Sequence, residues 1–587
     1  MTCACTVTPS RRPSAFARHW LTVRNRACGA ARMIRTVRPH SLDGSSWPAR
    51  LPALPKCGRE VLRARYAASG EHNRRAVISR VAKALAQAEL PAMRDVWARR
   101  FAATMQAGFV PAGRILAAAG AHTPSTWVNC FVQPIGEPTG PPLPAALAQT
   151  IATLRAGGGV GCDFSACDEV VATLRAFDDA CARALPEGPR PGAMMGVLRV
   201  DHPQIEAFIG AKDTGGLTHF NLSVAVDDTF MHQVQAGNPQ ARAVWKRLAR
   251  SACDHGEPGV LFIDTIRRDD SLGWCETIQA TNPCGEQPLP AYGSCCLGSF
   301  DLTRFVRRPL EADAAFDHAA LARAVPDAVR MLDNVIDLTP WPLPEQQAEA
   351  QRTRRIGLGV TGLADALILL GLHYGSPAAR HAAAAVVRTL RDAAFDASIA
   401  MARERGPCPA FDAPHHLRPP GYASRLPKAL HDRIARHGLR HSHLLSIAPA
   451  GSISLAICGG VSTGIEPVVA WRLHRTIRDH AGGSQPHALS DPAWRLHRRR
   501  HGASAALPPA FVTAQALRPA GHLAMLGALT RLIDGSISKT IPLTPTTCAA
   551  DVARLLSRAW RMGVKGLAVY RDNPVIPTVW RCRRLGP

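Results

Sequence analysis

The spacing of apolar positions divides the chain into a helical part and a much longer mixed part. In residues 76–89 and 95–108, apolar side chains recur every three or four positions, which predicts two amphipathic helices. Beyond residue 129, short apolar runs alternate with longer helical patterns. The predicted strands include 221–226, 259–264, 444–449 and 565–570, and the longest predicted helices cover 320–338 and 379–404. Such alternation is typical of an α/β layer or barrel fold.

The same patterns predict four parts of the chain. Residues 1–55 lack periodicity and are rich in arginine, so we expect a basic, disordered N-terminal extension or a segment upstream of the true start. A transit peptide has a similar composition and stays an alternative. We expect a small helical domain at 56–120, an α/β domain at 121–575 and a C-terminal tail at 576–587.

The positive charge is concentrated near the N-terminus, which weakens the inference from net charge to nucleic-acid binding. The formal charge is +25, but residues 1–80 hold 16 Lys and Arg against 3 Asp and Glu, so +13 lies there and +12 in the rest. The basic residues of the body are not interleaved with aromatic residues, so we do not expect the body to bind nucleic acid. A basic nucleic-acid-binding protein that uses residues 1–80 stays an alternative function.

Hydropathy and cysteine usage indicate the cellular setting. No run of eighteen apolar residues occurs, so no membrane span is expected. The chain holds 17 cysteines but no secretory segment and no C-x-x-C pair. This combination predicts a reducing, cytoplasmic setting and no metal site, with most thiols packed in the core.

One short segment, Asn282-Pro-Cys-Gly-Glu286, brings together residue types that can carry chemistry. Pro283 blocks a regular helix and Gly285 permits unusual backbone angles, so we expect a tight loop. Within it, a thiol can donate hydrogen, a carboxylate can act as a general base and an amide can hold a hydroxyl group. On residue types alone, a turn with a buried cysteine explains the segment equally well.

The segments NPCGE and SCCLGSFDL resemble the finger loop and following strand of ribonucleotide reductases, especially the adenosylcobalamin-dependent class II enzymes. Further matching segments follow in the family's order over residues 60–573, among them PAGRILAAAG, RAGGGVGCDFS, LLSIAPAGSISL and MGVKGLAVYRDN. The resemblance implies an α/β fold, a ten-stranded α/β barrel with a central finger loop, preceded by a small helical domain. It also implies reduction of ribonucleotides to 2′-deoxyribonucleotides by thiyl-radical chemistry.

The resemblance assigns a role to five residues. Cys284 matches the cysteine that becomes a thiyl radical and takes the 3′ hydrogen of the ribonucleotide. Glu286 matches the base for the 3′ hydroxyl, and Asn282 matches the amide that binds the sugar. Cys130 and Cys295 match the reducing pair that becomes a disulfide. Cys296, beside Cys295, is expected to be a packed thiol.

The resemblance also implies a set of substrate-binding residues. A Gly/Ser turn that leads into a helix offers backbone N–H groups and a hydroxyl to an anion, so we expect the turn at 449–453 to bind phosphate. Without the resemblance, the glycines would be read as ordinary turns. The expected residues are Asn129, Gly159, Pro283, Gly285, Pro449, Ala450, Gly451, Ser452 and Ile453.

Two absences within the sequence favour adenosylcobalamin as the cofactor. The five tyrosines include no adjacent pair for a radical relay, and the segment VWRCRRLGP lacks a glycyl-radical motif. The expected partners are a ribonucleoside diphosphate or triphosphate, thioredoxin or another dithiol, and a second copy in a homodimer. The specificity loop is short and only Cys582 stands where relatives carry a tail cysteine pair. A degenerate nucleotide-binding paralogue without turnover therefore stays an alternative.

Overall fold

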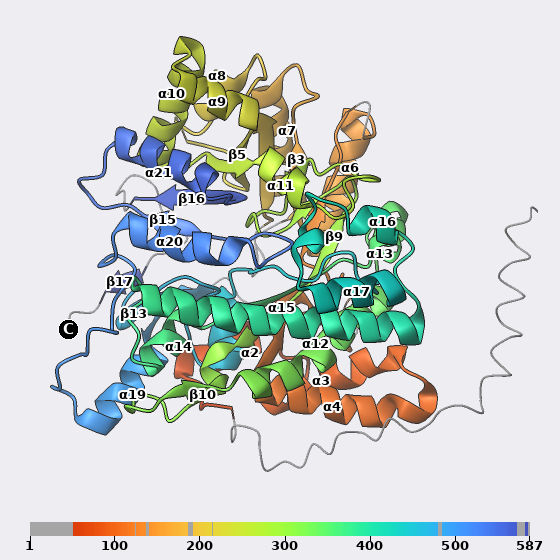
Figure 1. Ribbon diagram of the computed structural model, residues 1–587, viewed down its shortest axis with the longest axis vertical. Coiled ribbons are helices and arrows are strands. Elements are labelled where there is room, and N and C mark those ends of the chain that lie inside the picture. The colour runs from red at the N-terminus through yellow and green to blue at the C-terminus, as the bar shows by residue number, and fades with distance from the viewer. Residues whose placement is uncertain are drawn as a thin grey trace, which may run out of the picture. The chain divides into compact units, whose positions relative to one another are not determined.

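The computed structural model describes residues 51–587 apart from 122, 124, 137–139, 186–191, 214, 479–483, 572–581 and 585–587 (Figure 1). The predicted N-terminal extension and C-terminal tail therefore lie almost wholly outside the described residues. The described residues form one compact unit. Within the described part, no helix has the length and apolar character needed to cross a membrane.

From residue 51 onwards, three α-helices precede the sheet, and two of them lie where the apolar spacing predicts them. The helix α3 begins where Asn73 accepts a hydrogen bond from the Ala76 N–H, and it buries Val77, Val81 and Leu85 on one face. The helix α4 ends at Gly108, whose φ of +132° leads the chain into strand β1. The bounds are α2 Lys56–Arg65, α3 Arg74–Leu85, α4 Arg94–Ala107 and β1 Phe109–Pro111.

The main sheet has ten strands, which confirms the predicted strand number. Its order is β1-β9-β2-β3-β4-β5-β6-β16-β15, with β12 on the other edge of β9. The bounds of its other strands are β2 Cys130–Val132, β3 Gly159–Asp163, β4 Met194–Arg199, β5 Phe220–Val226, β6 Gly259–Phe262, β9 Ser294–Asp301, β12 Ile356–Thr361, β15 Thr540–Pro542 and β16 Gly566–Tyr570.

The sheet consists of two parallel halves that run against each other. Strands β2 to β6 pair in parallel, as do β9 with β12 and β15 with β16. The halves meet in antiparallel pairs, β2 with β9 and β6 with β16. Two isolated bridges, Leu358 with Leu445 and Ile447 with Ile537, continue the ring from β12 towards β15. This arrangement gives the barrel an interior into which a loop can enter.

Helices cover the outside of the barrel. The long helix α15, green in Figure 1, packs along α12 as the apolar periodicity predicts. The helices after β1 are α5 Gly113–Ala118, α6 Leu143–Arg155, α7 Val170–Ala184, α8 Ile205–Ile209, α9 Asp228–Ala236, α10 Pro239–His255, α11 Ile263–Asp269, α12 His318–Leu338, α13 Pro344–Thr353, α14 Leu363–Leu369, α15 Pro377–Arg405, α16 Ala413–His416, α17 Lys428–His437, α18 Gly451–Ile453, α19 Pro492–His501, α20 Pro519–Thr530 and α21 Ala549–Arg561.

Three small sheets complete the fold. The hairpin of β7 (Ala280–Thr281) and β8 (Pro288–Leu289) carries the segment 282–287 between its strands. Strands β10 (Val306–Arg307) and β11 (Ala315–Phe316) form a second pair. Strands β13 (Arg472–Arg478), β14 (Ser484–Ser490) and β17 (Cys582–Arg584) form a third sheet.

The segment 444–449 differs from its predicted strand. It forms two isolated bridges rather than a continuous strand. Its main chain still pairs on both sides, because the Ser446 N–H donates to the Leu358 carbonyl and the Ile447 N–H donates to the Ser536 carbonyl. The N–H groups of Leu444 and Leu445 instead donate to the Asp534 carboxylate at 2.8 and 2.7 Å. A carboxylate thus replaces part of the strand pairing that the apolar run predicts.

Candidate active site

The segment Asn282–Gln287 forms a closed loop at the tip of the β7–β8 hairpin. The Asn282 N–H donates to the Gln287 carbonyl at 3.1 Å, and the Gln287 N–H donates to Asn282 Oδ1 at 2.9 Å. The Gly285 N–H donates to the Asn282 carbonyl at 3.0 Å, and the φ of Gly285 is +80°. The tight loop expected from Pro283 and Gly285 is present, and the Asn282 side chain is fixed by a main-chain N–H group.

The barrel wall holds this loop at close range. A Cβ at Gly161 on β3 would lie 1.8 Å from the Thr281 carbonyl oxygen, so no other residue fits there without displacing the hairpin. On β5, the Asn221 side chain donates to the Pro283 carbonyl at 2.8 Å. On the opposite side, the Ser536 N–H donates to the Glu286 carbonyl at 3.0 Å. Contacts from two opposite sides of the barrel therefore fix the position of the loop inside it.

Cys130 and Cys295 lie directly opposite each other on the antiparallel strands β2 and β9. Directly opposed residues in such a pair have Cα atoms about 4.5–5.5 Å apart and side chains on one face. Disulfides span Cα separations of about 4.4–6.8 Å, so the pair can oxidise without a large backbone movement. Both thiols are buried and reduced in the structure.

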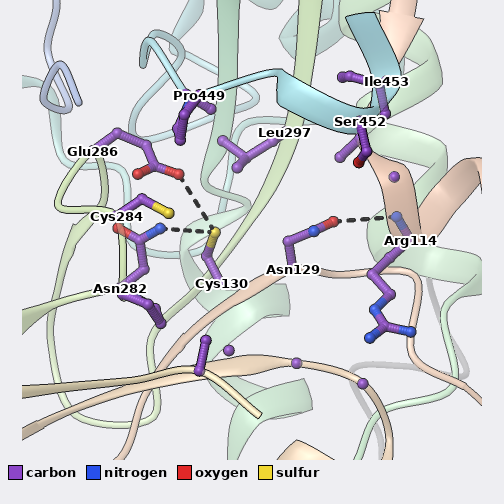
Figure 2. Close-up of a pocket in the computed structure, with 18 of the residues that line it drawn as sticks. Arg114, Asn129, Cys130, Asn282, Cys284, Glu286, Leu297, Pro449, Ser452 and Ile453 are labelled. Carbon is purple, nitrogen blue, oxygen red and sulfur yellow. Dashed lines mark hydrogen bonds between the residues drawn. The ribbon is translucent and has the colours of Figure 1, made fainter. Parts of the chain in front are cut away.

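The loop places its amide and its carboxylate beside Cys130 (Figure 2). Asn282 Nδ2 donates to Cys130 Sγ at 3.1 Å, and Cys130 Sγ lies 3.9 Å from Glu286 Oε1. Burial raises the pKa of Cys130 well above its usual value, and the charge of Glu286 raises it further. Cys130 is therefore a protonated thiol, and its S–H is directed at Glu286 Oε1.

Glu286 has the environment of a general base. Burial raises its pKa to about 7, although hydrogen bonds that favour the carboxylate oppose this shift. Its Oε2 atom is buried and has no hydrogen-bond partner among the described residues. A substrate hydroxyl could occupy that position, and a carboxyl group with a pKa near neutrality can accept its proton.

Cys284 differs from the other four residues because it is exposed to a cavity. Burial within the protein nevertheless raises the pKa of its thiol, with a contribution from the charge of Glu286. By contrast, Cys130, Asn282, Glu286 and Cys295 are at most 3% exposed. Cys284 is thus a neutral thiol within reach of a bound molecule.

A cavity of about 300 Å³ joins the finger loop to the turn at 449–453. Ten further predicted residues line it with Cys284 and Glu286, namely Asn129, Cys130, Gly159, Asn282, Pro283, Pro449, Ala450, Gly451, Ser452 and Ile453. Gly285 and Cys295 do not line it. Cys295 is the β9 partner of Cys130, so only one member of the thiol pair lines the cavity.

Sequence comparisons agree with this geometry. The family profile described as "Ribonucleotide reductase, barrel domain" matches residues 128–240 and 237–570. The chain belongs to the ribonucleotide reductase family. It is 35% identical over 569 residues to a vitamin B12-dependent ribonucleoside-diphosphate reductase of Mycobacterium tuberculosis, covering 87% of this chain and 78% of that protein. A protein of the same name from Thermoplasma acidophilum is 32% identical, with 76% of this chain and 61% of that protein covered.

The fold comparison agrees with the family. The alpha subunit of a class Id ribonucleotide reductase from Actinobacillus ureae superposes with a TM-score of 0.68 over 88% of this chain and 97% of that chain. Sequence identity to it is 20%, so this likeness concerns the fold alone. The ribonucleotide reductase barrel that the motifs imply is confirmed.

Two residues of this ribonucleotide reductase site were not singled out from the sequence. Arg114 lines the cavity, and its main-chain N–H donates to Asn129 Oδ1 at 3.4 Å. The motif PAGRILAAAG contains this arginine, so its positive charge within a matched motif could have marked it as a site residue. Tyr66 contacts the turn at 449–453 from the N-terminal helices, and no local pattern marks it.

Cys296 lies apart from this chemistry. Successive strand residues face opposite ways, so Cys296 points away from Cys130. It is buried, which raises its pKa, and the charges near it belong to Arg354, Asp333 and Asp337. These surroundings agree with the expected packed thiol. Among the described residues, no group of three or more His, Cys, Asp or Glu is arranged to hold a metal ion.

Proposed function

We propose that this protein reduces ribonucleoside diphosphates to the corresponding 2′-deoxyribonucleotides, with adenosylcobalamin as its cofactor. The observation that carries the proposal is the position of Asn282, Cys284 and Glu286 beside the opposed pair Cys130 and Cys295. The names of the relatives at 35% and 32% identity support both the diphosphate substrate and the cofactor.

The site fits this cofactor because it presents an accessible thiol. When bound, adenosylcobalamin supplies a radical that can remove the hydrogen atom from a thiol. That thiol must be accessible from a cavity, and Cys284 is the only one of the five catalytic candidates that is exposed. Cys284 is therefore the residue that would meet the cofactor.

The roles of the loop residues follow from their surroundings. As a thiyl radical, Cys284 takes the hydrogen atom from C3′ of the substrate and returns it at the end of the cycle. Glu286, with a pKa of about 7, accepts the proton of the 3′ hydroxyl. Asn282 is held by Gln287 and points at Cys130, so its amide can orient the sugar beside that thiol.

The opposed thiols supply the electrons. The 2′ hydroxyl leaves as water after it receives a proton from the site, and Cys130, which lines the cavity, is the thiol placed to give it. Cys130 and Cys295 together lose two electrons and two protons, and one S–S bond forms between them. The substrate gains the same two electrons, so each turnover converts one dithiol to one disulfide.

A reductant must then renew the pair. Cys130 and Cys295 are buried, and thiol–disulfide exchange requires access to a sulfur atom. We therefore propose that a small dithiol such as dithiothreitol sustains turnover through the cavity and that thioredoxin sustains less. The side chain of Cys582 lies outside the described residues. A homodimer and a cytoplasmic location stay predictions.

Anaerobic turnover of all four ribonucleoside diphosphates, with adenosylcobalamin and dithiothreitol, tests the proposed function. We expect 2′-deoxyribonucleotide product only when the cofactor is present, without any second protein subunit. Nucleotide binding without product would favour the degenerate paralogue. Activity restored by a metal-bearing second subunit alone would overturn the cofactor assignment.

A further inference from the structure

The N-terminal helix α2 packs against the segment that follows the phosphate turn. A Cβ at Gly58 on α2 would lie 2.5 Å from the Leu455 carbonyl oxygen, so the two backbones are in close contact. Leu455 belongs to the π-helical turn η5 (Ser454–Cys458), which continues α18. The Arg74 guanidinium donates to the carbonyl of Ile457 in the same turn. Residues 56–74 therefore hold the segment 451–458 in place.

Tyr66 extends this contact to the phosphate turn itself. It follows the last residue of α2 as its C-cap, and it is only 1% exposed. Its hydroxyl lies 2.5 Å from the hydroxyl of Ser452, although 386 residues separate the two in sequence. Ser452 lines the cavity opposite the finger loop (Figure 2). A residue of the N-terminal helices thus touches a side chain of the cavity wall.

A bound phosphate would determine which of the two hydroxyl groups donates in this hydrogen bond. A serine hydroxyl has one hydrogen to donate, whereas the oxygen atoms of an ionised phosphate only accept. When Ser452 donates to a phosphate, its oxygen must therefore accept from Tyr66. Hydrogen bonds in such a chain strengthen one another, so the Tyr66 hydroxyl both orients and polarises the Ser452 hydroxyl.

We propose that Tyr66 is a positioning residue for the phosphate group of the nucleotide, and that it acts by donating to Ser452. The inference rests on the proposed function in one respect, because Ser452 must meet the phosphate. It makes the helices before the barrel part of the nucleotide site. Removal of the Tyr66 hydroxyl leaves Ser452 free to rotate, which weakens phosphate binding and leaves the loop chemistry intact.

Calorimetric titration of the full chain with CDP and with cytidine tests this inference. The variant Tyr66→Phe keeps the ring and its packing and removes only the hydroxyl. We expect its affinity for CDP to fall by about three- to tenfold, the effect of one hydrogen bond, and its affinity for cytidine to stay unchanged. Ser452→Ala should lower CDP affinity similarly, and the double variant should add little to either single change.

Tyr422→Phe is the matched control. The Tyr422 hydroxyl is also buried and bonded, to the Leu532 carbonyl at 2.7 Å, but it does not line the cavity. Its loss should leave CDP affinity unchanged. In turnover assays, Tyr66→Phe should raise KM for CDP and leave kcat unchanged.

Three results would overturn the inference. They are unchanged CDP affinity in Tyr66→Phe, an equal loss of affinity for CDP and cytidine, and an unchanged CDP affinity in Ser452→Ala. The binding measurements need no turnover, so their outcome is separate from the outcome for the proposed function. A wild-type protein that binds CDP without reducing it would contradict the proposed function and still report on Tyr66.

Discussion

Cys130 on β2 and Cys295 on β9 stand directly opposite each other, although 165 residues separate them along the chain. The antiparallel junction between the two halves of the sheet creates this relationship. Of the two, Cys130 lines the cavity and Cys295 does not. In the proposed function, Cys130 meets the substrate and Cys295 completes the disulfide.

Replacement of Cys284 tests the radical role. We predict that Cys284→Ser abolishes turnover, because an O–H bond is stronger than an S–H bond and serine cannot replace the thiol as hydrogen donor. Nucleotide binding should survive, since the side chains are nearly equal in size. Anaerobic product assays with calorimetric binding provide the measurement. Cys548→Ser, which changes an exposed thiol at the N-cap of α21, is the control and should keep full activity. Retention of even a few per cent of activity in Cys284→Ser would contradict the assignment.

The pKa of Glu286 predicts the dependence of activity on pH. A general base must be ionised, and burial places the pKa of this carboxyl at about 7. We therefore expect kcat/KM to increase as pH rises through about 7 and to fall below it. A profile that is flat between pH 6 and 8 would argue against Glu286 as the base. Glu286→Gln should give no product at any pH.

The same pKa has a consequence for stability. The folded state holds the proton of Glu286 more tightly than the unfolded state, whose carboxyl ionises near pH 4.5. As pH rises from about 4.5 to above 7, the wild type therefore loses folding free energy that Glu286→Gln keeps. The Tm of Glu286→Gln should exceed that of the wild type at pH 8 and match it near pH 4. Equal Tm values at pH 8 would contradict the burial of an ionisable Glu286.

Gly161 tests how the finger loop is held. In Gly161→Ala the new Cβ would meet the Thr281 carbonyl oxygen at 1.8 Å, so the hairpin must move away from β3. We predict a loss of most of the activity, because displacement moves Asn282 and Glu286 away from Cys130. Gly521→Ala on α20 is the control, because its nearest neighbouring atom lies 4.0 Å away. Wild-type activity in Gly161→Ala would show that the loop tolerates displacement.

Asp333 on α12 holds a buried network of charges. It is 0% exposed and lies 2.6 Å from Arg354, 2.9 Å from Arg405 and 3.1 Å from Arg440. Asp333→Asn leaves the buried guanidinium of Arg354 and the half-buried ones of Arg405 and Arg440 without their shared carboxylate, which should cost about 3–5 kcal/mol of unfolding free energy. Urea titration measures the change. Asp432→Asn, which breaks an exposed pair with Lys428, should cost under about 1 kcal/mol.

The sequence predicted the regular elements well and the contacts between them poorly. The pattern at 379–404 corresponds to α15, and 221–226 lies within β5, because one face of each element is continuously buried. The strand predicted at 444–449 is present only in part. It pairs through bridges at Leu445 and Ile447, but Asp534, which is distant in sequence, takes the N–H groups of Leu444 and Leu445.

At the site, too, the sequence did not predict contacts between segments that are distant along the chain. The motifs brought Asn282, Cys284 and Glu286 together because they lie within five residues. The contact of Tyr66 with Ser452 and the approach of Thr281 to Gly161 depend on how distant segments pack. No local pattern encodes those distances, so only the three-dimensional structure provides them.

The central claim is that Cys130 and Cys295 supply the two electrons of each turnover. The most direct measurement mixes reduced enzyme, adenosylcobalamin and CDP without any reductant, then quantifies dCDP and maps the disulfides by mass spectrometry. We predict that product stops near one equivalent per active site and that a single new disulfide joins Cys130 to Cys295. Continued product formation without reductant, or one equivalent of product with Cys130 and Cys295 still reduced, would contradict the account.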